Sequence, residues 1–256
     1  MKIIIRNCNV AELDIPLKYA TKLYNEFAIR HPNAFYLRTR QRGMQNWDGK
    51  IKYITKTGQF KIGLLPSVYK RCIELGIKPI IVDMRQPLPK VSKVVTQIGK
   101  YKLRPEQEKA VKAILSNKLG ETPFQIGVLD YTVNAGKTLI MSALYLSYKK
   151  QLKTLLITND SDWLNQARDE FKQYLPGEDI TFVQGKVLNW SNFTIGMVQS
   201  ISRNMRFYQN ELAKVDMVLV DEADQAGSKQ YQNVLTRLFN TRVRIGLSGT
   251  IYMSKL

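Results

Sequence analysis

Residues 135–138 combine the small, basic and hydroxyl side chains with which proteins bind phosphate groups. Their order is Ala135-Gly136-Lys137-Thr138, at the start of a segment with the composition of a buried helix. A turn at a helix start presents backbone N–H groups and the positive end of the helix dipole to an anion. Lys137 would then reach the outer phosphates of a nucleotide, and the Thr138 hydroxyl would ligate Mg²⁺. The predicted nucleotide-binding residues are Asn134, Ala135, Gly136, Lys137, Thr138 and Leu139.

This phosphate motif departs from the general pattern at two positions. Tyr131 stands five residues before Gly136, where a glycine is usual, and Asn134 stands two before it. Asparagine adopts left-handed backbone conformations more readily than most residues, so the turn is still expected to form.

A pair of carboxylates supplies the second part of the chemistry. Asp221-Glu222 directly follows the apolar run 217–220. A carboxylate at the tip of a buried strand is where Mg²⁺ needs an anionic ligand, and the next one can orient or deprotonate the attacking water. We therefore predict Lys137, Asp221 and Glu222 as catalytic residues, with Thr138 and Asp221 as the metal ligands. The alternative, a solvated acidic turn, is disfavoured by the phosphate motif upstream.

The elements around these motifs alternate between helices and apolar strands. Because parallel strands all end at one edge of a sheet, the two motifs and Ser248-Gly249-Thr250 would lie together at the edge where α/β folds bind ligands. We expect an α/β fold, a parallel sheet with helices on both faces. The expected helices are residues 104–119, 137–148, 162–174 and 229–239, and the expected strands are 124–129, 154–158, 193–198, 217–220 and 243–247.

The first 95 residues predict a separate small α+β domain. We expect strands at 2–6, 35–42, 50–55, 60–64 and 79–82, helices at 15–29 and 67–75, and a proline-containing connection at 86–90, which leaves 96–256 as the second domain. Arg38, Arg40, Arg42, Lys50 and Lys52 would alternate along two of the strands, so that each set projects from one face. That face either follows a nucleic-acid backbone or is the exposed side of a sheet that buries Phe35, Leu37, Ile51 and Tyr53.

The net charge of +18 is concentrated in this N-terminal domain. Residues 1–100 hold 19 lysines and arginines against 6 carboxylates, whereas residues 101–256 hold 20 against 15. A basic domain beside a nearly balanced one suits a polyanion-binding module on a nucleotide-driven motor, although a solvated basic surface is the alternative. Two cysteines and one histidine argue against a structural zinc site, and no apolar stretch would span a bilayer, so we expect a cytoplasmic protein without membrane partners.

These motifs, in this order, resemble those of the superfamily 2 helicases and translocases. Residues 103–107 are similar to the adenine-contacting segment of that family, which implies nucleotide contacts by Gln107 and, more weakly, Arg104. The resemblance implies a RecA-like lobe with ATP and Mg²⁺ as cofactors, and a coupling role for Ser248, Gly249 and Thr250 between hydrolysis and nucleic acid. Residues 155–165 and 196–200 occupy the places of two nucleic-acid motifs, which implies contacts by Thr158, Asn159, Gln199 and Ser200.

Residues 46–51, Asn-Trp-Asp-Gly-Lys-Ile, resemble the segment that precedes the motor in phage helicases of the UvsW type. This resemblance implies branched or forked DNA as partner, in recombination, repair and replication-fork processing. Trp47 would either contact DNA or cover the core of the small domain. An RNA helicase or RNA-remodelling ATPase is the alternative function. Superfamily 2 motors complete their site with an arginine from a second RecA-like lobe, so we expect the chain to be the N-terminal part of a helicase about twice as long, with little activity alone.

Overall fold

The computed structural model describes residues 1–40, 44–91, 93–131, 136–148, 150–187 and 190–249. The chain divides into two compact units, Met1–Arg85 and Gln86–Leu256. The division falls after Arg85 and not at the predicted residue 95, because the connecting residues already pack on the second unit. Leu88, Val91, Val94 and Val95 contact its core, and the backbone N–H of Val95 donates to Ser147 Oγ at 3.0 Å.

The first unit is built on a four-stranded mixed sheet in the order β5-β2-β1-β6. β1 (Lys2–Ile5) runs antiparallel to β2 (Val10–Asp14) and parallel to β6 (Ile80–Asp83), and β5 (Gln59–Lys61) pairs with β2. Alternate residues of β1 and β2 are buried, as expected for strands with one covered face. Their partners in the core come from α1 (Leu17–Glu26), the short 3₁₀ helix η1 (Ile62–Leu64) and α3 (Leu65–Glu74).

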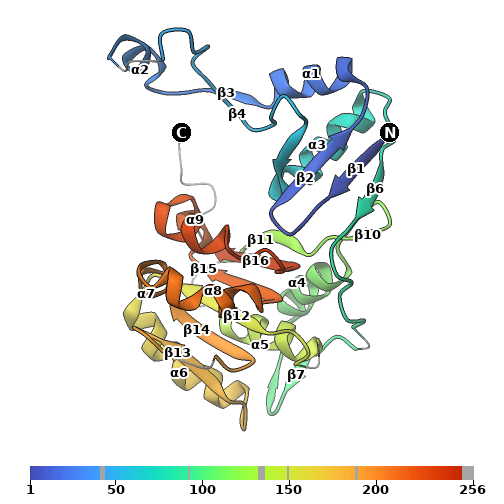
Figure 1. The fold of residues 1–256 in the computed structure, drawn as a ribbon. Coiled ribbons are helices and arrows are strands. Elements are labelled where there is room, and N and C mark those ends of the chain that lie inside the picture. The colour runs from blue at the N-terminus through green and yellow to red at the C-terminus, as the bar shows by residue number, and fades with distance from the viewer. Residues whose placement is uncertain (41–43, 92, 132–135, 149, 188–189, 250–256) are drawn as a thin grey trace. The chain divides into compact units, whose positions relative to one another are not determined.

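A two-stranded extension leaves this sheet and carries a short helix (Figure 1). β3 (Ala28–Arg30) pairs antiparallel with β4 (Lys50–Lys52), and α2 (Ala34–Arg40) lies between them in sequence. The strand predicted at 35–42 was therefore wrong for residues 35–40. Local contacts favour the helix, since the Arg40 guanidinium lies 4.6 Å from the Tyr36 ring centroid and Thr39 Oγ1 donates to the Phe35 carbonyl, both at a spacing of four residues. The shift also removes the predicted alternation of Arg38 and Arg40 along a strand.

The second unit is an α/β domain around a six-stranded, wholly parallel sheet in the order β11-β16-β15-β12-β14-β13. This confirms the predicted fold class. The strands are β11 (Ile126–Asp130), β12 (Thr154–Thr158), β13 (Ile180–Val183), β14 (Phe193–Met197), β15 (Met217–Asp221) and β16 (Val243–Ser248). β13, the hairpin β7 (Gln97–Ile98)–β8 (Tyr101–Lys102) and the helices α7 (Val198–Arg203) and α8 (Met205–Ala213) had no counterpart among the predicted elements. β9 (Lys118–Leu119), which pairs with β10 (Thr122–Pro123), replaces the end of the helix predicted at 104–119.

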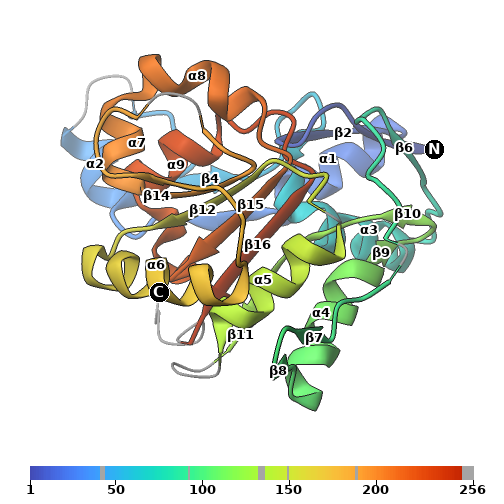
Figure 2. The ribbon, with the colours of Figure 1, turned by 90° about the horizontal axis from the view of Figure 1, so that it is seen from below.

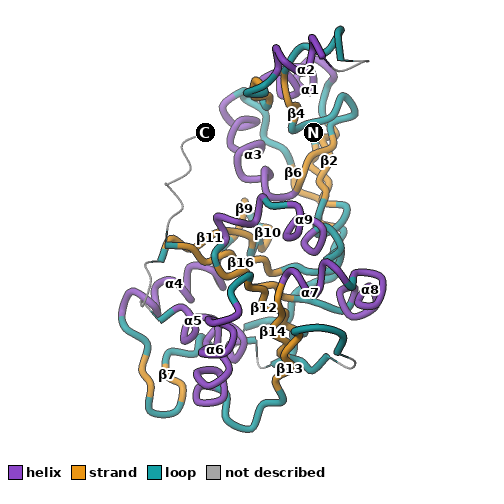
Figure 3. Tube along the Cα trace, turned by 90° about the vertical axis from the view of Figure 1, so that its left-hand side faces the viewer, coloured by secondary structure: helices purple, strands orange, loops and turns teal. Residues whose placement is uncertain are grey.

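Helices cover both faces of this sheet (Figures 2 and 3). One face holds α4 (Pro105–Ser116), α5 (Lys137–Ser147) and α6 (Ser161–Tyr174); the other holds α7 (Val198–Arg203), α8 (Met205–Ala213) and α9 (Lys229–Leu235). The alternation of side chains along β15 supplies both cores, because Met217 and Leu219 face the first layer whereas Val218 and Val220 face the second.

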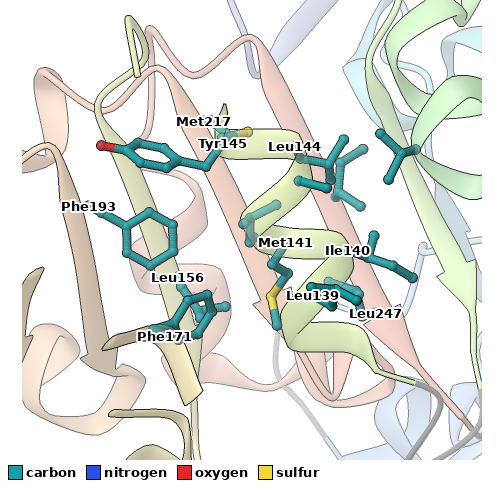
Figure 4. Close-up of a cluster of buried hydrophobic side chains, with 14 of the residues drawn as sticks. Leu139, Ile140, Met141, Leu144, Tyr145, Leu156, Phe171, Phe193, Met217 and Leu247 are labelled. Carbon is teal, nitrogen blue, oxygen red and sulfur yellow. The ribbon is translucent and has the colours of Figure 1, made fainter. Parts of the chain in front are cut away.

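α5 is the centre of the larger core (Figure 4). Nearly all of its residues are buried, and Leu139, Ile140 and Leu144 share this core with Leu247. The Tyr145 and Phe193 rings meet edge to face with centroids 4.9 Å apart. The helix that carries the phosphate motif is thereby held rigidly against the sheet.

Candidate nucleotide site and nucleic-acid surface

Lys137 and the two predicted carboxylates meet at the carboxyl edge of the parallel sheet. α5 begins at Lys137, and β15 ends at Asp221. The Lys137 Nζ atom lies 3.2 Å from Glu222 Oε1 and 3.7 Å from Asp221 Oδ1. The lysine side chain is 10 % exposed, so its ammonium group is held by these two carboxylates in a largely desolvated position. A phosphate group bound here would replace the two carboxylates as the ion-pair partner of the Lys137 ammonium group.

Gly136 meets two steric demands at the start of α5. Its φ of +81° lies in the left-handed region, and a Cβ atom at this position would lie 2.5 Å from Gln107 Nε2. Gln107 is buried, and its Oε1 atom accepts a hydrogen bond from the Arg104 backbone N–H at 2.8 Å, which caps α4. The segment predicted to contact adenine is thus packed directly on the phosphate-motif glycine.

Asp221 has the properties of a cation ligand. It is only 2 % exposed, and its Oδ1 atom has no hydrogen-bond partner among the described residues. Burial raises the pKa of this carboxyl to about 6; the negative charge of Glu222 adds to the rise, and Lys137 opposes it. A buried anionic oxygen without a hydrogen-bond partner is stabilised by a metal ion, and Mg²⁺ prefers oxygen ligands such as this carboxylate and the Thr138 hydroxyl. The residues present therefore fit Mg²⁺.

Glu222 takes an uncommon backbone conformation with φ of +49°. It lies between the end of β15 and the 3₁₀ helix η2 (Ala223–Gly227), and its side chain remains about a third exposed. A left-handed non-glycine residue at this point turns the chain sharply, so consecutive carboxylates enter different surroundings, one buried and one open to solvent. This difference suits the distinct roles predicted for them.

A cavity of about 410 Å³ lies beside Lys137. Its wall includes a stripe of four α6 side chains that the sequence did not point to, since their spacing of three or four residues also fits an ordinary exposed helix face. Arg104 lines the cavity, whereas Gln107 lies behind Gly136. The lining residues are Arg104, Gly136, Lys137, Thr138, Trp163, Gln166, Glu170, Tyr174 and Glu222.

The Ser248 motif is linked to the acidic segment. Ser248 Oγ donates to Asp224 Oδ1 at 3.1 Å; Ser248 is the last residue of β16, and Asp224 lies in η2, which follows β15. Gly246 permits the close approach of β16, because a Cβ atom there would lie 2.6 Å from Ala223 Cβ. Gly249 ends the described chain, and Thr250, Asn134 and Ala135 lie outside the described residues.

Three of the four predicted nucleic-acid residues on the second unit lie at this same edge in partly exposed positions. Asn159 Nδ2 donates to Gln225 Oε1, and Gln199 Nε2 donates to the Asn159 carbonyl at 3.2 Å. Ser200 lies in the first turn of α7, one residue after Gln199. Thr158 differs from the expectation: it is fully buried, and its hydroxyl accepts from the Asp160 N–H, so it orders the turn into α6 and presents no hydroxyl at the surface.

The predicted basic residues of the first unit are only partly available. Arg38, Arg40 and Lys50 are exposed. Lys52 is held by Asp48, 3.2 Å away, and lies 4.6 Å from the Tyr24 ring centroid, so its charge is already partnered. Arg42 lies outside the described residues. The alternative of a sheet that buries Phe35, Ile51 and Tyr53 was wrong, since all three are exposed.

Trp47 is partly buried and has defined contacts. Its Nε1–H donates to the Lys50 carbonyl at 3.0 Å, and its ring meets His31 edge to face at 5.7 Å. The hydrogen bond closes the turn that leads into β4, and the ring contact joins this turn to the residue that follows β3.

Comparisons with known proteins place this site in a family. The family model described as "Type III restriction enzyme, res subunit" matches residues 100–253, more than half of the chain. The chain belongs to this family of superfamily 2 helicases. Among the described residues, no helix is both long and apolar enough to cross a bilayer.

Two viral relatives match the helicase sequence. The ATP-dependent DNA helicase UvsW of bacteriophage T4 is 24% identical over 227 residues, 80% of this chain and 43% of its own length. Protein L396 of Acanthamoeba polyphaga mimivirus, named as a candidate ATP-dependent RNA helicase, is 26% identical over 149 residues, 57% of this chain and 27% of its own. The chain therefore spans less than half the length of the curated relatives that it matches.

Solved structures of T4 UvsW share the fold. One superposes with a TM-score of 0.73 at 21% identity, covering 98% of this chain and 93% of that one. A second gives a TM-score of 0.75 at 21% identity and covers 100% of this chain but 54% of that one. The likeness includes the small N-terminal sheet as well as the RecA-like sheet.

Proposed function

We propose that this chain supplies the ATP-binding half of a helicase that acts on branched DNA. The observation that carries the proposal is the position of the Lys137 ammonium group, between Asp221 and Glu222 and next to the left-handed Gly136. Membership of an ATP-dependent helicase family and the name of the T4 relative, a DNA helicase, support it.

Each residue of the site has a separate task in this proposal. Lys137 exchanges its carboxylate partners for the outer phosphates of ATP, and the backbone N–H groups at the start of α5 bind the same anion. Thr138 and Asp221 hold Mg²⁺, which neutralises charge on the phosphates when bound. Asp221 must be ionised for this task, so metal binding and proton loss from this carboxyl are coupled.

Glu222 orients and deprotonates the attacking water. Its partial exposure gives water access, whereas the buried Asp221 is closed to solvent. The charge that develops on the transferring phosphate needs a further cation, for which related NTPases use an arginine worth about 10³–10⁵ in rate. We propose that a second RecA-like lobe supplies it, so the 256 residues alone bind ATP and hydrolyse it slowly.

Coupling to nucleic acid runs through the hydrogen bond between Ser248 and Asp224. It joins the end of β16 to the segment that follows Glu222, and the Asn159–Gln225 contact joins that same segment to β12. A rearrangement at Glu222 would thereby move residues of the proposed DNA surface, formed by Asn159, Gln199 and Ser200.

DNA is preferred over RNA because of the first unit. The match to a solved UvsW structure covers 98% of the chain and so includes the sheet and the basic extension of the first unit. The match to L396 covers only 57% of the chain. An RNA-remodelling ATPase is the second candidate, favoured by the name of L396.

Two binding measurements test the proposal. Lys137→Ala should weaken binding of a fluorescent ATP analogue with Mg²⁺ by about tenfold or more, the effect of losing a charge-assisted contact. Lys172→Ala, which removes an exposed lysine of α6, should leave binding unchanged. Equal affinities for the two variants would contradict the nucleotide site.

The substrate class is tested by titrating the chain with a DNA fork, a linear duplex and a hairpin RNA at one salt concentration. Tighter binding to the fork is expected. Tighter binding to the RNA would replace the proposal by its alternative, and rapid DNA-stimulated ATP turnover by these residues alone would contradict the need for a second lobe.

A further inference from the structure

The extension of the first unit is formed by β3, α2 and β4 (Figure 1). It exposes aromatic side chains that are not buried in its own fold. Phe35 is 80 % exposed and Tyr36 53 % exposed, the first of these being the most exposed large apolar side chain among the described residues. The aliphatic pair Ile29–Ile51 of the two strands, opposite each other in register, is also exposed. Several exposed apolar residues on one short element indicate a contact surface.

α2 is oriented so that these rings face outward. Ala34 is buried, and Gly49 lies so close that a Cβ atom there would be 3.0 Å from Ala34 Cβ. Leu37, three residues later, is partly buried on the same side of the helix. The opposite side presents Phe35 and Tyr36 to solvent.

The two rings differ in what covers them. Arg40 stacks over Tyr36 with its guanidinium 4.6 Å from the ring centroid, and its NH1 group donates to the Tyr36 hydroxyl at 3.1 Å. Among the described side chains, Phe35 has no such ring or cation contact. Its neighbour at a spacing of three residues is Arg38, also exposed. An uncovered phenyl ring thus has Arg38 three residues away on the helix surface, whereas Arg40 covers the adjacent Tyr36 ring.

The charge of the extension points to a polyanion as the occupant of this face. Residues 28–53 contain six lysines and arginines and a single carboxylate, Asp48. Asp48 forms an ion pair with Lys52. Its pKa is lowered, mainly by a hydrogen bond from the Lys50 backbone N–H, so the carboxylate is ionised and neutralises only these neighbouring lysines. By sequence the extension therefore carries a net charge of +5.

We propose that the outer face of α2 binds unpaired nucleotides at the branch point of DNA, with the Phe35 ring stacked on a base and the Arg38 guanidinium group on a flanking phosphate. This rests on the proposed function. In a duplex both faces of each base are covered by neighbouring pairs, so only an unpaired base offers a face to a phenyl ring, and stacking of this kind is independent of sequence. A surface that bound only DNA phosphates would need basic and polar groups and not an exposed phenyl ring.

The test compares two DNA ligands of equal length and charge, a fork with unpaired nucleotides at the junction and a fully paired duplex. Phe35→Leu keeps the apolar surface but removes the aromatic face, and Phe35→Trp restores one. Leu17→Ala, at a residue 77 % exposed on α1, is the matched control. Both positions are exposed, so the three variants should melt like the wild type.

Phe35→Leu should bind the fork about tenfold more weakly and the duplex equally well, whereas Phe35→Trp and Leu17→Ala should bind both like the wild type. A 2-aminopurine base at the junction should be quenched by the wild type and by Phe35→Trp but not by Phe35→Leu. Unchanged fork binding by Phe35→Leu, or equal losses on fork and duplex, would overturn the stacking contact. A dimer of the wild type in sedimentation that Phe35→Leu abolishes would assign the face to a second copy of the chain instead.

Failure of this inference is separable from failure of the proposed function. If the wild type binds forks but Phe35→Leu does so equally, DNA binding stands and only the stacking role is lost. If the wild type binds neither DNA ligand, both are rejected.

Discussion

Replacing Asp221 by asparagine should make the nucleotide-free protein more stable and its metal-nucleotide binding weaker. The carboxyl group is 2 % exposed, and burial raises its pKa to about 6 from an ordinary value of 3.8. The folded state therefore holds its proton more tightly than the unfolded state does. Ionising the group at pH 7 costs the folded protein about 3 kcal/mol, a cost that an uncharged amide of the same shape avoids.

The pH dependence of this gain follows from the direction of the pKa change. Since the pKa is raised on folding, the wild-type protein loses stability as the pH rises from about 4 through 6. Asp221→Asn should thus gain about 3 kcal/mol at pH 7, about half of that at pH 5 and little at pH 4. For the second unit, 3 kcal/mol corresponds to a rise in Tm of roughly 6–12 °C.

Thermal unfolding followed by circular dichroism between pH 4 and pH 8 measures this difference. The matched control is Glu222→Gln, which removes a carboxylate from the same lysine but at a position about a third exposed. Its effect on stability should stay below about 1 kcal/mol because a solvated carboxylate has little desolvation to relieve. A stability difference between Asp221→Asn and wild type that is constant from pH 4 to pH 8, or a loss of stability at pH 7, would refute the reasoning.

Three further substitutions probe separate parts of the structure. Gly136→Ala should lower the free energy of unfolding by about 1–2 kcal/mol and abolish nucleotide binding, because it adds a clash with Gln107 to an unfavourable φ; Gly177→Ala, with φ of +80° but open space around it, should show only the smaller backbone effect in the same melts. Trp163→Ala should weaken binding of the fluorescent nucleotide roughly threefold to tenfold if the cavity wall contacts the base, and equal affinity would argue against that contact. Arg38→Glu should weaken binding to all DNA ligands and lower the slope of log affinity against log salt by about one, and an unchanged slope would show that Arg38 contacts no phosphate.

Much of the second unit was predictable because its parallel strands are buried and nearly continuous in apolar residues. β12 was predicted to its exact ends, and β15 and β16 each to within one residue. Lys137, Asp221 and Glu222 could be brought together without coordinates, since strands of a parallel sheet end at one edge and the residues that follow them meet there.

The small unit was less predictable because its elements are short and held by few contacts. Residues 34–40 alternate in a way that suits a strand, yet the contacts of Arg40 with Tyr36 and of Ala34 beside Gly49 make them a helix. Thr158 illustrates the same limit in the second unit. A short polar residue at a strand end can face a ligand or, as here, turn inward and accept a hydrogen bond from the backbone N–H two residues later.

The order of the motifs, the parallel α/β fold and the meeting of Lys137 with Asp221 and Glu222 follow from the sequence alone, because periodicity and chain direction are local properties. The burial and raised pKa of Asp221, the stripe of α6 side chains along the cavity beside Lys137, the exposure of Phe35 and the pairing of Lys52 are seen only in the tertiary structure. Burial, desolvation and side-chain partners depend on residues far apart in the chain, so no local pattern contains them.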